Sequence, residues 1–226
     1  MNHLIIAAHP DDEVLGCGGT ITRLTNERQN VYVAILGEGI TSRSRQREQA
    51  DPAALEALRN DSRRVSELLG VRELFLYDLP DNRFDTVPLL DIVKRLEEIL
   101  SMVQPTVVFT HHGGDLNIDH AIIHRATLTA TRPVPGNSVR RLYAYEVPSS
   151  TEWAFGQWSR GFRPNVFMDI TATLETKITA MQGYESEARS FPHPRSPESL
   201  RIQARKWGST AGVEAAEAFE LIRATE

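Results

Sequence analysis

An apolar run near the N-terminus ends abruptly in one histidine and three acids, and no other feature constrains this chain as strongly. Residues 4–8, Leu-Ile-Ile-Ala-Ala, predict a short strand that is buried on both faces. The polar side chains that follow it are His9, Asp11, Asp12 and Glu13. Pro10 restricts its own φ angle and favours an extended conformation at His9. Open α/β sheets place their sites beyond the carboxyl ends of strands, so we expect a functional site here.

Three interpretations of this segment remain open from the residues alone. Imidazole and carboxylate ligands are typical of a hydrolytic zinc or a non-haem iron, and a spare carboxylate can act as a base. The acids also suit the first turn of a helix, which accounts for Glu13 but not for His9. The glycines at 16–19 could instead cradle a pyrophosphate, although their spacing is not G-x-G-x-x-G and the preceding acids would repel a phosphate.

A second cluster offers the further ligand that a metal site needs. Residues 106–110 predict another short strand, and the polar segment 111–117 follows it. Asp119 and His120 then open an apolar-periodic segment, 121–130, that predicts a helix. The alternative is that Asp119 caps this helix and that His120 lies on the surface.

Strands and helices alternate along the 226 residues, which predicts a Rossmann-like, three-layer α/β/α fold with a mostly parallel sheet. The expected strands are 4–8, 31–36, 74–77, 106–110, 142–147 and 166–170. The expected helices are 18–27, 52–69, 89–102, 120–131, 173–188 and 197–207. This length and pattern favour one domain over residues 1–226.

Composition excludes several classes of protein. A net charge of −5 argues against a nucleic-acid binder, which usually carries a basic excess. The one cysteine, Cys17, excludes an internal disulfide and is expected to be a small buried residue. No apolar run approaches the roughly 18 residues of a membrane helix, and no signal peptide precedes the first strand, so we expect a cytoplasmic protein without a membrane span.

These motifs resemble the LmbE/PIG-L family of metal-dependent de-N-acetylases. The family's signatures are an apolar strand running into Ala-His-Pro-Asp-Asp-Glu and a later x-x-Asp-His at a helix start, here residues 8–13 and 117–120. Family-like segments also occur at 36–39, 69–71 and 216–219. The resemblance implies one zinc ion per chain, or another divalent metal such as iron, held by His9, Asp12 and His120.

The same resemblance implies catalytic roles. Asp11 would be the general base that activates the water on the metal, and Asp119 resembles an aspartate that supports the family's metal ligands. Many members carry a histidine where this chain has Asn117, and that histidine is thought to steady the oxyanion or protonate the leaving amine. An amide donates a hydrogen bond but delivers no proton at neutral pH. The identity of the general acid therefore stays open. Asp11 is the first candidate, His193 is the second, and His111 or His112 is the third.

Loops at the same sheet edge supply candidates for substrate binding. They are Arg43, Arg59, Asp81, Asn82 and His193. Arginine suits a phosphate or a sugar hydroxyl, although each candidate also has an ordinary alternative as a solvated, capping or ion-paired side chain. Trp153 is a further candidate, for stacking on a sugar ring. The alternating Tyr143 and Tyr145 are expected to pack rather than to bind an oxyanion.

Together these observations predict hydrolysis of an N-acetyl amide on an amino sugar or glycoconjugate. The acetyl-sugar part comes from the resemblance, whereas the residues themselves support metal-assisted hydrolysis. Alternatives are a zinc amidase acting on another amide, such as a thiol conjugate, and a non-catalytic sugar- or nucleotide-binding module. A non-haem iron oxygenase has the same type of ligands but no other support. The sugar and the native metal stay open, and a homo-oligomer is compatible with the sequence.

Overall fold

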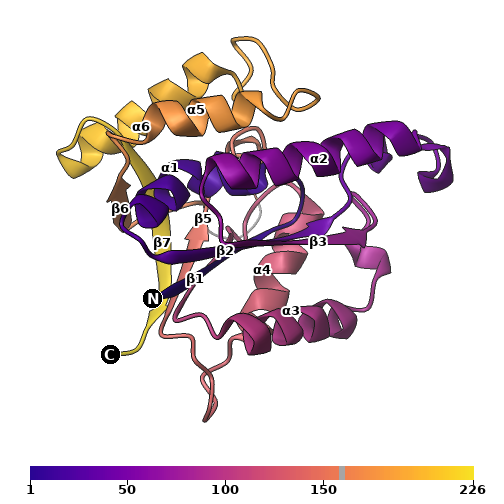
Figure 1. Ribbon diagram of the computed structural model, residues 1–226, viewed down its shortest axis with the longest axis horizontal. Helices are drawn as coiled ribbons and strands as arrows, with labels where there is room; N and C mark the ends of the chain where they lie inside the picture. Colours follow the sequence, from indigo (N-terminus) through magenta and orange to yellow (C-terminus); the bar gives the residue numbers. More distant parts are fainter. Residues whose placement is uncertain (158–160) are drawn as a thin grey trace.

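The computed structural model describes residues 1–157 and 161–226, and in this part of the chain seven strands form one sheet between two layers of helices (Figure 1). The strands are β1 (Asn2–Ala7), β2 (Asn30–Gly37), β3 (Glu73–Leu79), β4 (Val107–His111), β5 (Arg141–Tyr145), β6 (Val166–Asp169) and β7 (Ala216–Ala224). Their order is β3-β2-β1-β4-β5-β7-β6. Strands β1 to β5 pair in parallel, and β7 is antiparallel to both of its neighbours. The predicted mostly parallel, three-layer fold is confirmed.

Helices cover both faces of the sheet, with one group on each face (Figure 1). The first group is α1 (Asp12–Asn26), α2 (Pro52–Leu68), α5 (Leu174–Gln182) and α6 (Pro197–Ala211), and the second is α3 (Leu89–Val103) and α4 (Ile118–Ala130). Strand β1 is buried on both sides, because Ile5 packs into one core and Leu4 into the other. Among the described residues, no helix combines the length and the apolar character needed to cross a membrane.

Helix α1 begins at Asp12, six residues before the predicted start at residue 18. The glycines at 16–19 therefore lie inside a helix, and they do not form a loop that could cradle a pyrophosphate. A Cβ on Gly16 would lie 2.2 Å from the ring of Tyr145, and one on Gly19 would lie 2.8 Å from Ile170. Close packing between α1 and its neighbours explains these glycines, and it overrides their low helix propensity.

Strand β7 was not predicted, because charged residues interrupt its apolar pattern. One of them, Glu217, is buried and accepts hydrogen bonds from the backbone N–H groups of Gly19 and Thr20 in α1. Its Oε1 also lies 2.6 Å from Nζ of the equally buried Lys177 in α5. This buried ion pair joins β7 to two helices of one layer. The predicted helix 173–188 also ends early, at Gln182.

Lys177→Met is expected to lower the free energy of unfolding by about 3–5 kcal/mol, because it leaves the Glu217 carboxylate buried without its cation. Urea denaturation measures this change. Arg201→Met is the control, since it breaks an exposed ion pair with Glu175 that should contribute about 1 kcal/mol or less. Equal losses in the two variants would contradict the role assigned to the buried pair.

Candidate metal and catalytic site

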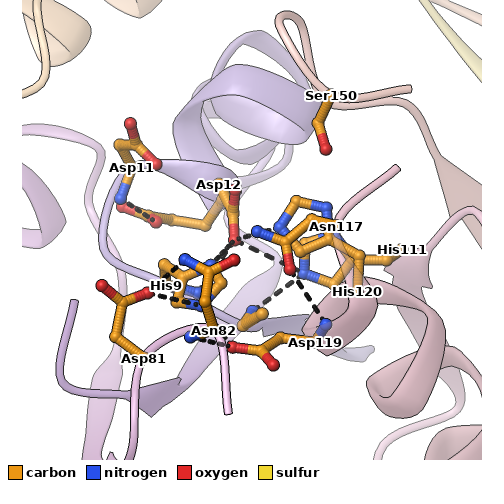
Figure 2. A network of polar contacts seen from close by, with 12 residues as sticks. His9, Asp11, Asp12, Asp81, Asn82, His111, Asn117, Asp119, His120 and Ser150 are labelled. Atoms are coloured by element: carbon orange, nitrogen blue, oxygen red, sulfur yellow. Dashed lines mark hydrogen bonds and ion pairs between the residues drawn. The ribbon is translucent and has the colours of Figure 1, made fainter. Parts of the chain in front are cut away.

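The two predicted clusters meet where the strand order of the sheet reverses. Strands β1 and β4 are neighbours there, and their carboxyl ends lie at the crevice in which open α/β sheets bind ligands. His9 follows β1, Asp12 begins α1 and His120 lies in the first turn of α4. One potential ligand atom from each of the three residues lies within 4.8 Å of the others. Asp12 Oδ2 is 3.4 Å from His9 Nδ1 and 3.2 Å from His120 Nε2 (Figure 2).

Asp119 orients the ring of His9. Its Oδ2 lies 2.9 Å from His9 Nε2, and its two oxygens also accept the backbone N–H groups of Asn82 and Phe84. The Asp119 side chain is fully buried, so these contacts hold it in one position. Because Nε2 faces Asp119, the Nδ1 atom of His9 faces Asp12 and is the atom that is free to bind a metal.

His120 has a matching arrangement on the other side of the cluster. Its Nδ1 lies 3.2 Å from Asp115 Oδ1, and its ring stacks on that of His111 with the centroids 4.0 Å apart. Asp115 is held in turn by the hydroxyl groups of Ser150 and Thr151. Within the described residues, neither buried nitrogen of His120 makes a hydrogen bond of good geometry. A buried imidazole nitrogen without such a partner, beside a second imidazole and a carboxylate, fits a divalent metal ligand.

The charges of the cluster favour a cation. Burial alone would raise the pKa of Asp12, but His120 and His111 hold it well below its usual range. Burial alone would lower the pKa of His120, but Asp12 and Asp115 raise it to about 9. His9 behaves in the same way, because Asp119 and Asp12 outweigh the effect of burial and raise its pKa. A metal ion that binds this cluster therefore has to displace protons.

Metal affinity is consequently expected to rise with pH between pH 6 and pH 8. Both imidazoles must be neutral to bind a metal, and the pKa of His120 at about 9 means that its proton is still present throughout this range. Each displaced proton should increase the apparent affinity by about tenfold per pH unit. Competition with a chelator of known affinity at the two pH values measures the change. An affinity independent of pH would contradict this description of the cluster.

Asp11 lies beside the cluster but faces a different partner. Its Oδ2 accepts a hydrogen bond from Arg195 Nη1 at 2.7 Å, and the carboxylate lies apart from the two imidazoles of His9 and His120 in Figure 2. Burial raises the pKa of Asp11 well above its usual range, and the nearby Arg195 opposes this effect only in part. A carboxyl with a raised pKa is a stronger base than an ordinary one, which suits a proton acceptor.

A cavity of about 570 Å³ opens over these groups. Its lining includes four of the five residues predicted to bind substrate, Arg43, Asp81, Asn82 and His193, and it also includes Asn117 and Trp153. Arg59 lies on α2 and is not among the lining side chains, whereas the neighbouring Leu58 is. The structure therefore gathers most of the predicted residues around one space and leaves Arg59 outside it.

Several of these side chains are already engaged with other groups. Arg43 Nη2 donates to both carboxylate oxygens of Glu187, at 2.6 and 2.7 Å. Asp81 accepts from the Ser42 hydroxyl and lies 3.2 Å from His9 Nε2, so part of its role is structural. The ring of His193 meets that of Trp153 edge to face at the cavity wall.

Asn117 caps the helix that carries His120. Its Oδ1 accepts the backbone N–H of Asp119 at 2.9 Å, which is the usual contact of an N-cap residue. The amide nitrogen of Asn117 points toward Asp12 in Figure 2. The side chain therefore presents a hydrogen-bond donor, and no proton donor, to the cavity.

The remaining candidate acids and the tyrosines have structural partners. His111 Nε2 accepts the backbone N–H of Ala8 at 2.8 Å, and burial holds the pKa of His111 well below its usual range. His112 is paired with Glu220 and does not line the cavity. Tyr145 donates to the Ile6 carbonyl, which confirms that it packs in the core.

Arg195, Glu187 and Asp115 were not predicted as site residues. Arg195 contacts Asp11 from 184 positions away, and no spacing rule links the two. Asp115 belongs to the polar loop after the fourth strand. Its closeness in sequence to the predicted ligand His120 was the one feature that could have identified it as a site residue.

The chain is similar to several known proteins. A family model described as PIG-L, GlcNAc-PI de-N-acetylase, matches residues 4–131. The diacetylchitobiose deacetylase of Thermococcus kodakarensis is 24% identical over 97% of this chain and 82% of its own. The 4-oxalmesaconate hydratase of Pseudomonas putida is 28% identical over 79% of this chain and 71% of its own. The structure of the conserved protein TT1542 from Thermus thermophilus superposes with a TM-score of 0.76 and 25% identity, covering 99% of this chain and 96% of that one.

Proposed function

The chain belongs to the PIG-L family, and from that membership and the geometry of its site we propose that it is a zinc-dependent hydrolase that removes an N-acetyl group from an amino sugar or glycoconjugate. The observation that carries the proposal is the convergence of His9, Asp12 and His120, with a spare buried carboxylate, Asp11, beside them. Three protein ligands are typical of catalytic zinc, because they leave one coordination position open.

Each side chain has a distinct task in this proposal. A bound zinc ion would polarise the amide carbonyl and lower the pKa of a water to about 7. Asp11 accepts the proton of the attacking water, and it later passes that proton to the departing amine. Arg195 holds one oxygen of Asp11, which leaves the other available for the proton. Asn117 donates a hydrogen bond toward the substrate, and Asp119 keeps the ring of His9 in place.

The walls of the cavity suit a sugar. Asn82, Arg43 and His193 supply hydrogen-bonding groups, and Trp153 supplies an apolar face. The similarity to a diacetylchitobiose deacetylase and to a probable N-acetyl-alpha-D-glucosaminyl L-malate deacetylase supports the same class of substrate. Because the lining extends to Arg195, well beyond the matched residues 4–131, we propose that residues 1–226 function as one domain.

A second candidate is hydration of a carbon–carbon double bond. The similarity to a hydratase favours it. Amide hydrolysis on another substrate, such as a thiol conjugate, would use the same ligands and base.

The test is acetate release from a panel of N-acetylated mono- and disaccharides by zinc-loaded protein. We expect acetate and a free amine in equal amounts from at least one sugar. An N-acylated thiol conjugate and an unsaturated carboxylic acid serve as the competing substrates. Turnover of either one, with none of the sugars, would assign the site to the corresponding alternative.

Asn117→Ala is expected to lower kcat by about 10–10³-fold, the range up to that seen when an oxyanion donor is removed, and to leave the shape of the pH profile unchanged. The substitution also removes the cap of α4, at a cost of about 1 kcal/mol. Asn117→Ser separates the two effects, because serine caps a helix but cannot donate through an amide. We expect Asn117→Ser to be as stable as the natural protein and as slow as Asn117→Ala. Full activity in Asn117→Ser would show that the cap alone matters.

A further inference from the structure

The backbone of Asp11 is held in an unusual conformation. Its φ is 100°, in a region that residues with a side chain rarely adopt, and such a residue costs of order 1–3 kcal/mol. Conformations of this kind persist only where the surroundings impose them. In the structure, the N–H of Asp11 donates to Glu13 Oε2 at 3.2 Å.

Glu13 is itself held by a residue that is distant in the sequence. Its side chain is 1% exposed, and its Oε1 accepts the hydroxyl of Tyr184 at 2.6 Å. Tyr184 is fully buried and lies just beyond the end of α5. A buried carboxyl is costly unless it is hydrogen-bonded, and here one oxygen faces Tyr184 while the other faces the Asp11 backbone.

We infer that Glu13, anchored by Tyr184, is a positioning residue for the general base. The inference rests on the proposed function, in which Asp11 takes the proton. Glu13 is not among the side chains that line the cavity, whereas Asp11 is, so Glu13 acts through Asp11 and not on the substrate. The turn that Glu13 stabilises directs two adjacent carboxylates to different partners. Asp12 faces the two imidazoles, and Asp11 faces Arg195.

A purely structural role is the alternative. Asp11 is the N-cap residue of α1, and a glutamate that reaches back to an N-cap N–H resembles a capping box. Loss of such a contact lowers the free energy of unfolding by about 1 kcal/mol and is not expected to change turnover.

A matched pair of substitutions separates the two roles. Glu13→Gln keeps an oxygen that can accept the Asp11 N–H, and Glu13→Met has a similar size but no acceptor. Each is made in the natural chain and in Asp11→Asn, and kcat, KM and bound zinc are measured with the N-acetylated sugar that the natural protein deacetylates. Asp51→Ala is the capping control, since Asp51 caps α2 through the N–H of Ala53.

We expect Glu13→Met to lower kcat by about 10–100-fold, the loss typical of a catalytic group displaced by about 1 Å, with zinc content and KM unchanged. Glu13→Gln should recover most of this loss, and Asp51→Ala should have full turnover. In the Asp11→Asn background, Glu13→Met should cause no further loss. A crystal structure of Glu13→Met should show that the φ of Asp11 has left the positive region.

Other outcomes would overturn the inference. Equal losses from Glu13→Met with and without Asp11→Asn would mean that Glu13 acts independently of the base. Loss of zinc in Glu13→Met would mean that it acts through the metal ligands. If Glu13→Met does not fold, Tyr184→Phe is tested in its place. It should lower kcat by less than the roughly 10–100-fold expected for Glu13→Met, and this loss should be absent in the Asp11→Asn background. Normal turnover of Asp11→Asn itself would refute the proposed base, which is a separate failure.

Discussion

Asp11→Asn is expected to lower kcat by about 10²–10⁴-fold while the protein still binds one zinc ion per chain. The amide has the shape of the carboxylate and can still accept a hydrogen bond from Arg195, but it cannot take a proton from water. The proposed ligands His9, Asp12 and His120 are untouched. Acetate release measures kcat, and atomic absorption on the same sample measures the metal.

Asp85→Asn is a suitable control, because this carboxylate is exposed and does not line the cavity. It should have the kinetics of the natural protein. Turnover of Asp11→Asn close to that of the control would remove Asp11 from the role of base, and the raised pKa of its buried carboxyl would then need another explanation.

His120→Ala is expected to abolish stoichiometric zinc binding and, with it, turnover. Loss of a residue that merely supports a metal ligand typically costs about 10–100-fold in metal affinity, so loss of one of three protein ligands should cost more. The fold should survive, because His120 lies at the end of the sheet and contributes little to either apolar core. Zinc content after dialysis and the circular dichroism spectrum test both points.

His112→Ala is the matched control for this substitution. It lies on the loop before α4, pairs with Glu220 and does not line the cavity, so zinc binding should be unaffected. Full zinc content in His120→Ala would exclude His120 from the ligand set. Asp81 would then be the residue to test, since it also lies close to His9.

The sequence predicted the part of the site that depends on strand ends. The ligand candidates follow directly after β1 and open α4, and parallel strands bring such positions to one edge of the sheet. Their proximity could therefore be predicted without knowledge of a long-range contact, whereas their identity as the ligand set came from the resemblance to the LmbE/PIG-L family. The layered fold was predictable for a similar reason, because the alternation of apolar strands and helices is local.

The contacts that hold Asp11 could not be predicted from the sequence. Arg195 contacts Asp11 from 184 positions away and Tyr184 contacts Glu13 from 171 positions away, and neither lies in a periodic or spaced motif. The start of α1 itself was placed too late, because glycines normally disfavour a helix. Here the ring of Tyr145 requires the small residue at position 16.

We propose that amide hydrolysis requires one metal ion held by His9, Asp12 and His120. The most direct test is to strip the protein with a chelator, add zinc back in steps, and measure acetate release from the best N-acetylated sugar at each step. We predict no release without metal and a linear rise that ends at one zinc ion per chain. Acetate release by the metal-free protein at the rate of the reconstituted one would contradict the account.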